Sequence, residues 1–235
     1  MIAVPASPPV RMAARQRLDF LCECRERENR MKEYTIHRFD TVEESQNAPW
    51  TAVSQYCWGG AYRPQMRAQI ALVAGTGFVC RMQCDEQKPV ARYDSYFSPV
   101  YTDSCMEWFC AFGGEGDPRY LNVESNSRGA CLCEIGTFRG DRKDASTDGR
   151  TPPVSVLAQP LAAGWSLETV VPFETIARLF GVEESFFVPG RVLRGNLYKC
   201  CETDPFTHFA VWNPVSSPTP DFHRPECFGR FVIGD

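Results

Sequence analysis

The chain has 235 residues, of which 43% are hydrophobic and 23% charged, enough apolar material for one globular domain with a sizeable core. Its 25 basic and 29 acidic residues give a net charge of −4, so the broad basic surface typical of nucleic-acid binding is absent. No stretch approaches the roughly 20 apolar residues of a membrane helix. We therefore expect neither a nucleic-acid partner nor a membrane span.

The first thirty residues differ in composition from the rest of the chain. They carry six arginines and four acidic residues, and they lack the apolar segment of a secretory signal. We expect residues 1–30 to be a disordered tail, or sequence upstream of a functional start at Met31. Residues 31–235 are then a single domain, and without a signal peptide we expect a cytoplasmic location.

Twelve cysteines are many for a chain of this length. Their spacings, such as Cys131-x-Cys133 and the adjacent pair Cys200-Cys201, do not form a disulfide framework. A domain this long does not need covalent cross-links, and zinc is disfavoured because there is no C-x-x-C pair and there are only three histidines. We expect mostly buried, reduced thiols.

Alternation of apolar and polar residues predicts many short strands. Two alternating runs, 66–73 and 78–84, flank Gly75-Thr76-Gly77 and predict a β-hairpin. Further strands are predicted at 105–112, 119–126, 130–136, 165–171, 191–199, 207–212 and 227–233.

One segment is typical of a helix. Residues 172–180 begin with proline, carry an acid in the first turn and are followed by Gly181. The polar stretch 139–153 is predicted to be a solvated loop. The pattern indicates an all-β fold, an antiparallel sandwich or barrel with one short helix.

Four predicted strands pair an apolar face with a face of amides, carboxylates, arginine and aromatic residues. On the polar faces we place Glu107; Tyr120, Asn122, Glu124 and Asn126; Arg194, Asn196 and Tyr198; and His208 and Trp212. Any solvent-facing sheet surface is polar, but lysine and threonine would be expected there. The residues present are those that hydrogen-bond sugar hydroxyls and stack on a pyranose ring, as in a small-ligand site.

Other residues are expected to be structural. Asp103 precedes a strand, where a turn-capping role is usual, and Trp108 and Trp165 fall on apolar faces. Arg194 has an alternative role as an ion-pair partner of Glu107 or Glu124.

Several motifs resemble the family 9-like carbohydrate-binding domains. VYTDSCMEWFCAF (100–112) followed by YLNVESNSRG (120–129) is similar to the core signature of that family. RGNLYKC (194–200), HFAVWNPV (208–215) and PDFHRPECFG (220–229) resemble the ending of its bacterial branch. The resemblance covers residues 34–235 and implies a β-sandwich related to DOMON domains.

The resemblance implies non-catalytic recognition of a sugar, often a chain end, between aromatic side chains. By position in the motifs, the ligand-binding residues would be Glu107, Asn122 and Glu124, with Trp212 as the stacking residue and Arg194, Asn196 and Tyr198 on the third motif strand. No second tryptophan matches, and Tyr101 or Trp58 would replace it. His223 lies in a motif expected to fix the last loop against the sandwich.

The implied partners are a carbohydrate and glycoside-processing enzymes acting in trans. Several members of the wider family hold structural calcium through oxygen ligands, so calcium is possible here, although no acidic loop shows a ligand pattern. No other cofactor is expected.

Two other functions stay open at this point. Glu107 and Glu124 resemble the carboxylate pair of a glycoside-processing enzyme, and Cys200 or Cys201 with His208 is a weaker nucleophile candidate. The DOMON relationship also raises haem binding, for which His208 with Met66 or Met106 would be the axial ligands.

Overall fold

The computed structural model describes residues 31–235, which form one compact unit from Lys32 onward. The described residues contain one α-helix, α2 (Phe173–Phe180), and fourteen strands. The strands are β1 (Glu33–Phe39), β2 (Thr51–Val53), β3 (Gln55–Gly59), β4 (Met66–Val73), β5 (Gly77–Cys84), β6 (Cys105–Ala111), β7 (Tyr120–Asn126), β8 (Cys131–Gly136), β9 (Lys143–Asp144), β10 (Ser155–Leu161), β11 (Gly164–Pro172), β12 (Val192–Cys201), β13 (His208–Val211) and β14 (Gly229–Ile233). The predicted all-β fold with one short helix is confirmed.

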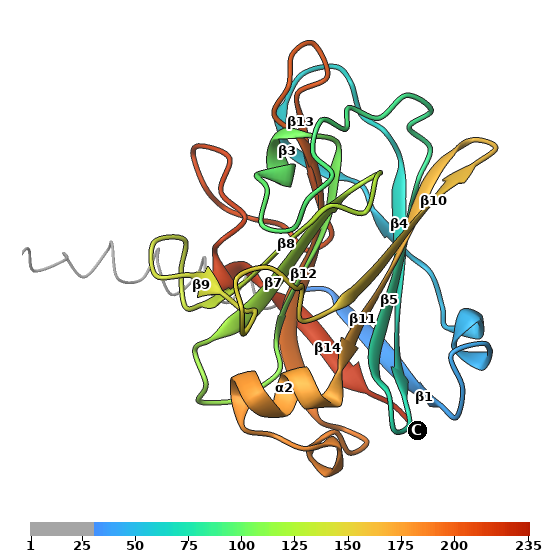
Figure 1. Cartoon of the computed structure of the whole chain (residues 1–235), viewed down its shortest axis with the longest axis vertical. Helices are drawn as coiled ribbons and strands as arrows, with labels where there is room; N and C mark the ends of the chain where they lie inside the picture. Colours follow the sequence, from blue (N-terminus) through green and yellow to red (C-terminus); the bar gives the residue numbers. More distant parts are fainter. Residues whose placement is uncertain (1–30) are drawn as a thin grey trace, which may run out of the picture. The chain divides into compact units, whose positions relative to one another are not determined.

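The strands belong to one continuous sheet that curls into two facing layers (Figure 1). One layer has the order β10-β11-β5-β4, with β2 beside β4, and the other has the order β14-β12-β6-β7-β8-β9, with β13 beside β12 and β3 beside β13. Strand β1 joins the layers because it pairs with both β4 and β14.

The sequence predicted a wholly antiparallel sheet, but the sheet also contains parallel pairs. Strand β1 runs parallel to β14 and to β4. Parallel neighbours need long connections. The two partners of β1 are far from it in sequence, since β14 is the last strand of the domain and β4 follows only after β2 and β3. Alternation within a strand cannot reveal such distant partners.

The predicted hairpin and helix are both present. Strands β4 and β5 pair from Met66 opposite Cys84 to Val73 opposite Gly77. Helix α2 follows Pro172 and ends at Gly181, whose φ of 74° is the left-handed conformation that glycine adopts easily.

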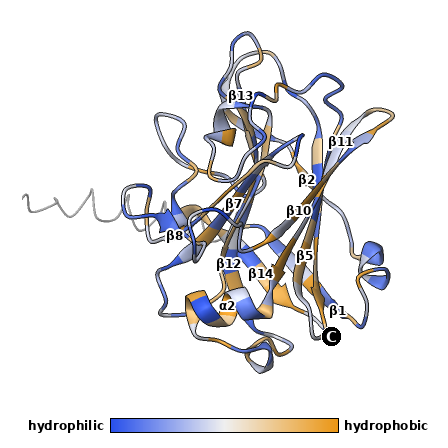
Figure 2. Ribbon diagram, viewed as in Figure 1, coloured by the Kyte–Doolittle hydropathy of each residue, from blue (hydrophilic) through white to orange (hydrophobic). Residues whose placement is uncertain are grey.

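The main hydrophobic core lies between the two layers. Trp108 and Trp165 are 1% and 2% exposed in this core, as expected from the sequence. In Figure 2, hydrophobic residues gather along the strands, while the connecting loops are mostly hydrophilic. No helix of the described residues is long and apolar enough to cross a membrane.

The described cysteines are all unpaired, and all but Cys57 are buried. The prediction of mostly buried thiols is confirmed, since nine of these ten residues are buried. Cys22 and Cys24 lie outside the described residues, as does the whole of the predicted tail, 1–30.

A second apolar cluster covers the other face of the β6-containing layer. Strand alternation directs Met106 and Trp108 into the main core and Phe109 to this outer face. The chain that follows β13 returns across it and packs Phe222 and Phe228 against the strands. This covered face carries the candidate site.

Candidate functional site

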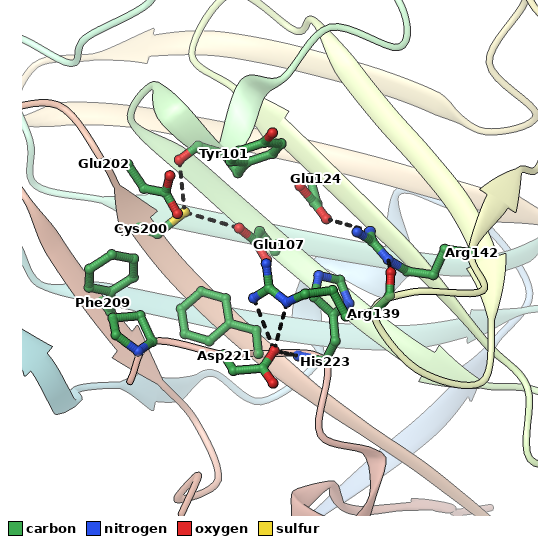
Figure 3. Close-up of a pocket in the computed structure, with 12 residues that line it drawn as sticks. Tyr101, Glu107, Glu124, Arg139, Arg142, Cys200, Glu202, Phe209, Asp221 and His223 are labelled. Atoms are coloured by element: carbon green, nitrogen blue, oxygen red, sulfur yellow. Dashed lines mark hydrogen bonds and ion pairs between the residues drawn. The ribbon is translucent and has the colours of Figure 1, made fainter. Parts of the chain in front are cut away.

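A pocket of about 170 Å³ opens on the outer face of the second layer (Figure 3). Its floor comes from strands β6, β7 and β12, which supply Glu107, Glu124 and Cys200. Its walls come from segments far apart in the sequence, which supply Tyr101, Arg139, Arg142, Glu202, Phe209, and residues 220–223.

Two carboxyl groups lie side by side on the pocket floor. Glu107 on β6 and Glu124 on β7 are direct cross-strand partners, and each residue is only 2% exposed. Glu107 Oε1 accepts a hydrogen bond from Cys200 Sγ at 3.0 Å, and Glu124 Oε1 accepts one from Asn122 Nδ2 at 3.0 Å. Glu124 Oε2 is buried without a hydrogen-bond partner among the described residues.

Burial changes the protonation of this pair. Loss of solvent raises the pKa of Glu107 to about 7. Burial and then the neighbouring Glu107 raise the pKa of Glu124 well above its usual value. At neutral pH the two carboxyls therefore hold at least one proton between them, and the pair can both donate and accept hydrogen bonds.

Two arginines from the segment 139–153 form one wall. Arg142 makes an ion pair with Glu134 and lies 3.7 Å from Glu124 Oε1. Arg139 pairs with Asp221 at 2.9 Å. The sequence predicted this segment to be a solvated loop, and its composition contains no signal that these side chains turn inward.

Aromatic side chains form the other wall. Figure 3 shows Tyr101 on one side of Cys200 and Phe209 on the other. Phe222 also lines the pocket and stacks on Tyr198, with ring centres 4.1 Å apart. Phe209 and Phe222 were not among the predicted site residues, because alternation had placed Phe209 on the core side of its strand.

His223 both fixes the last loop and lines the pocket. Its Nδ1 lies 3.0 Å from the hydroxyl of Tyr120. Burial, and then the nearby Arg142 and Arg139, lower the pKa of His223 to about 2. The imidazole is therefore neutral.

The structure brings three of the eight predicted site residues together in the pocket: Tyr101, Glu107 and Glu124. Two others do not line the pocket but contact residues that do. Asn122 donates a hydrogen bond to Glu124, and the ring of Tyr198 stacks on that of Phe222. Asn196 is buried and hydrogen-bonds the backbone of Asn213.

Trp212 lies in the main core, where it is 1% exposed. Its ring stacks on Phe231, and its indole nitrogen donates to Thr51 Oγ1 at 3.0 Å. A methyl group at Gly229 would collide with this indole. Trp212 is therefore not placed to stack on a ligand in the pocket, and the predicted face of β13 must be reversed.

Two further sequence expectations can be placed. Trp58 does not line the pocket and packs at 6.2 Å and 6.4 Å from the rings of Phe222 and Phe209. Asp103 is buried and accepts hydrogen bonds from the backbone of Arg92 and Tyr93, which agrees with a structural role.

Arg194 does not pair with Glu107 or Glu124, and it lies outside this pocket. It donates instead to the backbone oxygen of Phe228 at 2.7 Å.

The geometry does not suit a haem ligand or a cysteine nucleophile at His208. Both ring nitrogens of this buried histidine already have partners, Lys199 Nζ at 2.9 Å and the backbone oxygen of Phe206 at 2.6 Å. Met66 and Met106 are buried in the main core.

In residues 31–235, one cluster brings three side chains of metal-ligating kinds close together: Cys105, Glu107 and Cys200. Calcium takes oxygen ligands, whereas two of these three residues are thiols. The cluster does not fit calcium, and a calcium requirement stays a prediction.

The model of carbohydrate-binding family 9 matches residues 38–233. The chain belongs to this family. As a family member it is a non-catalytic carbohydrate-binding domain, and neither the glycoside-processing nor the haem alternative is supported.

Solved structures share the fold of this family 9 domain. A candidate carbohydrate-binding protein from Bacteroides uniformis superposes with a TM-score of 0.72 at 22% identity, covering 86% of this chain and 99% of that one. A family 9 module from Caldicellulosiruptor kristjanssonii, solved with cellotriose, has a TM-score of 0.62 at 8% identity, covering 86% and 94%. The glucose complex of a family 9 module from that organism gives 0.62 at 9% identity, covering 87% and 97%. No curated protein matches the chain.

Proposed function

We propose that the pocket above Glu107 and Glu124 is the carbohydrate-binding site of this domain. The observation that carries the proposal is that Glu124 lines the floor of an open pocket while its Oε2 is buried without a hydrogen-bond partner among the described residues. A buried polar atom without a partner costs about 1–3 kcal/mol, and a ligand hydroxyl would remove that cost.

The chemistry of the floor suits a sugar hydroxyl. Such a group donates one hydrogen bond and accepts others, and the Glu107–Glu124 pair offers both a proton and lone pairs at neutral pH. The arginines are already paired with Glu134 and Asp221. We therefore infer that the ligand is a neutral sugar and not an acidic one.

The size of the pocket favours one sugar ring. Its volume of about 170 Å³ is below the roughly 300–1,000 Å³ of pockets for drug-sized ligands. Tyr101, Phe209 and Phe222 offer apolar surface for the C–H face of that ring. The glucose and cellotriose complexes of family 9 modules make a glucose-type terminal ring the first ligand to test.

The test is calorimetric titration of the full chain with glucose and cellotriose. We expect Glu124→Ala and Tyr101→Ala each to weaken binding, with Glu124→Ala costing at least about tenfold because a buried hydrogen bond is lost. Trp212→Phe, which changes the main core and not the pocket, is the matched control and should keep the wild-type affinity.

The proposal fails if Glu124→Ala binds as tightly as the wild type while Trp212→Phe abolishes binding. Such a result would mean that binding depends on the packing around Trp212 and not on Glu124.

Glycoside-processing enzymes acting in trans are our proposal for the partners of this domain. A binding domain increases the residence of a sugar chain near the enzyme that cleaves it. A cytoplasmic location stays a prediction from the sequence.

A further inference from the structure

A second hollow lies at the other end of strand β12, and three arginines line it. It has a volume of about 590 Å³ and is bordered by Arg191, Arg194 and Arg230. Arg194 and Cys200 are six residues apart on β12, so this hollow lies roughly 20 Å along the strand from the sugar pocket.

Arg194 and Arg230 are direct partners across the antiparallel pair β12–β14. Side chains in such positions lie on the same face with Cβ atoms about 4.5–5.5 Å apart, and like charges there repel. The arrangement is therefore unfavourable unless a negative charge lies between or above the two guanidinium groups.

Arg194 is also incompletely hydrogen-bonded. One terminal nitrogen donates to the backbone oxygen of Phe228 at 2.7 Å, but its Nε is buried without a partner among the described residues. Burial, and then the charge of Arg230, lower the pKa of Arg194. A bound anion would raise the pKa of Arg194, and so oppose the lowering by burial and by Arg230.

The acidic groups around the hollow neutralise its three arginines only in part. Glu33 pairs with Arg230 at 3.0 Å, whereas Glu115 lines the hollow without an ion pair to any of the three arginines within 4 Å. Arg191 lies over the ring of Phe186 at 4.2 Å. Within residues 31–235, Arg194 and Arg191 thus have no carboxylate partner at ion-pair distance.

We propose that this hollow binds an oxyanion, a phosphate or sulfate group, at a site separate from the sugar pocket. The guanidinium of Arg194 keeps an Nε–H without a hydrogen-bond partner among the described residues, and Arg230 and Arg191 add positive charge to the same hollow. Planar guanidinium groups bind such oxyanions through paired, charge-assisted hydrogen bonds. The natural carrier of the group would be a phosphorylated or sulfated carbohydrate or a lipid headgroup, which share this chemistry.

The first experiment titrates the full chain with inorganic phosphate and with sulfate by calorimetry, at constant ionic strength so that screening does not change. We expect saturable binding that Arg194→Gln and Arg230→Gln each weaken at least about tenfold, because each loses a charge-assisted hydrogen bond. Arg150→Gln, an exposed arginine outside the hollow, should bind as the wild type does.

Sugar titrations in the same variants separate this inference from the proposed function. Arg230 is 44% exposed in its side chain, so Arg230→Gln should fold normally and bind sugar like the wild type, whereas Glu124→Ala should lose sugar and keep phosphate. In Glu124→Ala, where the sugar pocket no longer contributes, glucose 6-phosphate and glycerol 3-phosphate then distinguish a sugar-borne from a lipid-borne group by which binds more tightly.

The inference is overturned if no saturable phosphate or sulfate binding is found, or if Arg194→Gln and Arg230→Gln bind these anions as tightly as Arg150→Gln. In either case the arginines serve the fold alone.

Discussion

At the scale of single residues, Glu107 couples the stability of this domain to pH. Its carboxyl is 2% exposed and faces Glu124, and burial raises its pKa from 4.5 to about 7. The folded chain therefore holds a proton that the unfolded chain releases above pH 4.5. The free energy of unfolding should fall as pH rises from about 4.5 through 7, by an amount on the order of 3 kcal/mol.

The variant Glu107→Gln tests this coupling. Glutamine has nearly the same shape and no charge to bury, so we expect the variant to be more stable than the wild type at pH 8 and similar to it near pH 4.5. Urea unfolding at both pH values measures the difference. Glu226→Gln, at a side chain that is 50% exposed, is the control. An equal pH dependence in Glu107→Gln and the wild type would show that Glu107 does not carry it.

Alternation in the sequence was enough to place Glu107 and Glu124 on one face, because their neighbours Trp108 and Val123 are large and apolar. The same reasoning placed Trp212 on the ligand-facing side of its strand, and this was wrong. All four residues of β13 are buried, since the chain after this strand covers its outer face. With both faces apolar, hydrophobicity along the strand does not distinguish the core side from the ligand side.

At the scale of elements, the segment 139–153 matters most for the pocket. It was predicted as a solvated loop, and it does carry exposed residues, but β9 pairs with β8 and brings Arg139 and Arg142 to the pocket wall. The sequence could not show this, since a two-residue strand has no periodicity. The parallel pairs of β1 were missed for a similar reason, because register between distant segments is set by tertiary packing.

We expect Arg139→Gln to affect binding more than stability. The ion pair with Asp221 is exposed, at 57% and 25% of the two side chains, and such pairs contribute about 0–1 kcal/mol. The pair also joins the two segments that close the pocket. Sugar affinity should fall several-fold while the free energy of unfolding changes by less than about 1 kcal/mol.

Calorimetry and urea unfolding on the same preparations check both parts of this prediction. Arg150→Gln in the same segment is the control for loss of positive charge. Unchanged sugar affinity in Arg139→Gln would mean that the wall holds its shape without the ion pair.

At the scale of the whole molecule, a buried ionic network connects the two layers. Lys199 on β12 is fully buried, and its Nζ lies 3.2 Å from Glu86 Oε2, just after β5 in the other layer. Trp165 and Ser104 also donate to Glu86. Burial is the largest single influence and would raise the pKa of Glu86, but Lys199, Ser104 and His208 together outweigh it, so the pKa is lowered.

His208 completes this network as a neutral group. Burial, and then the charge of Lys199, lower its pKa to about 4, so its Nε2 can accept a hydrogen bond from Lys199 at 2.9 Å. Each polar group of the network thus depends on the others, and removing one leaves a buried charge without its partner.

The variant Lys199→Met should therefore destabilise the domain strongly, by about 3–5 kcal/mol, because Glu86 stays buried without its cation. The double variant Lys199→Met/Glu86→Gln should recover much of that loss, since no uncompensated charge remains. Urea unfolding of the two single variants and the double variant measures the coupling. The network lies on the side of the sheet away from the sugar pocket, so sugar affinity of the folded double variant should match the wild type. Additive losses in the double variant would show that Lys199 and Glu86 stabilise the two layers independently, and that packing alone holds the layers together.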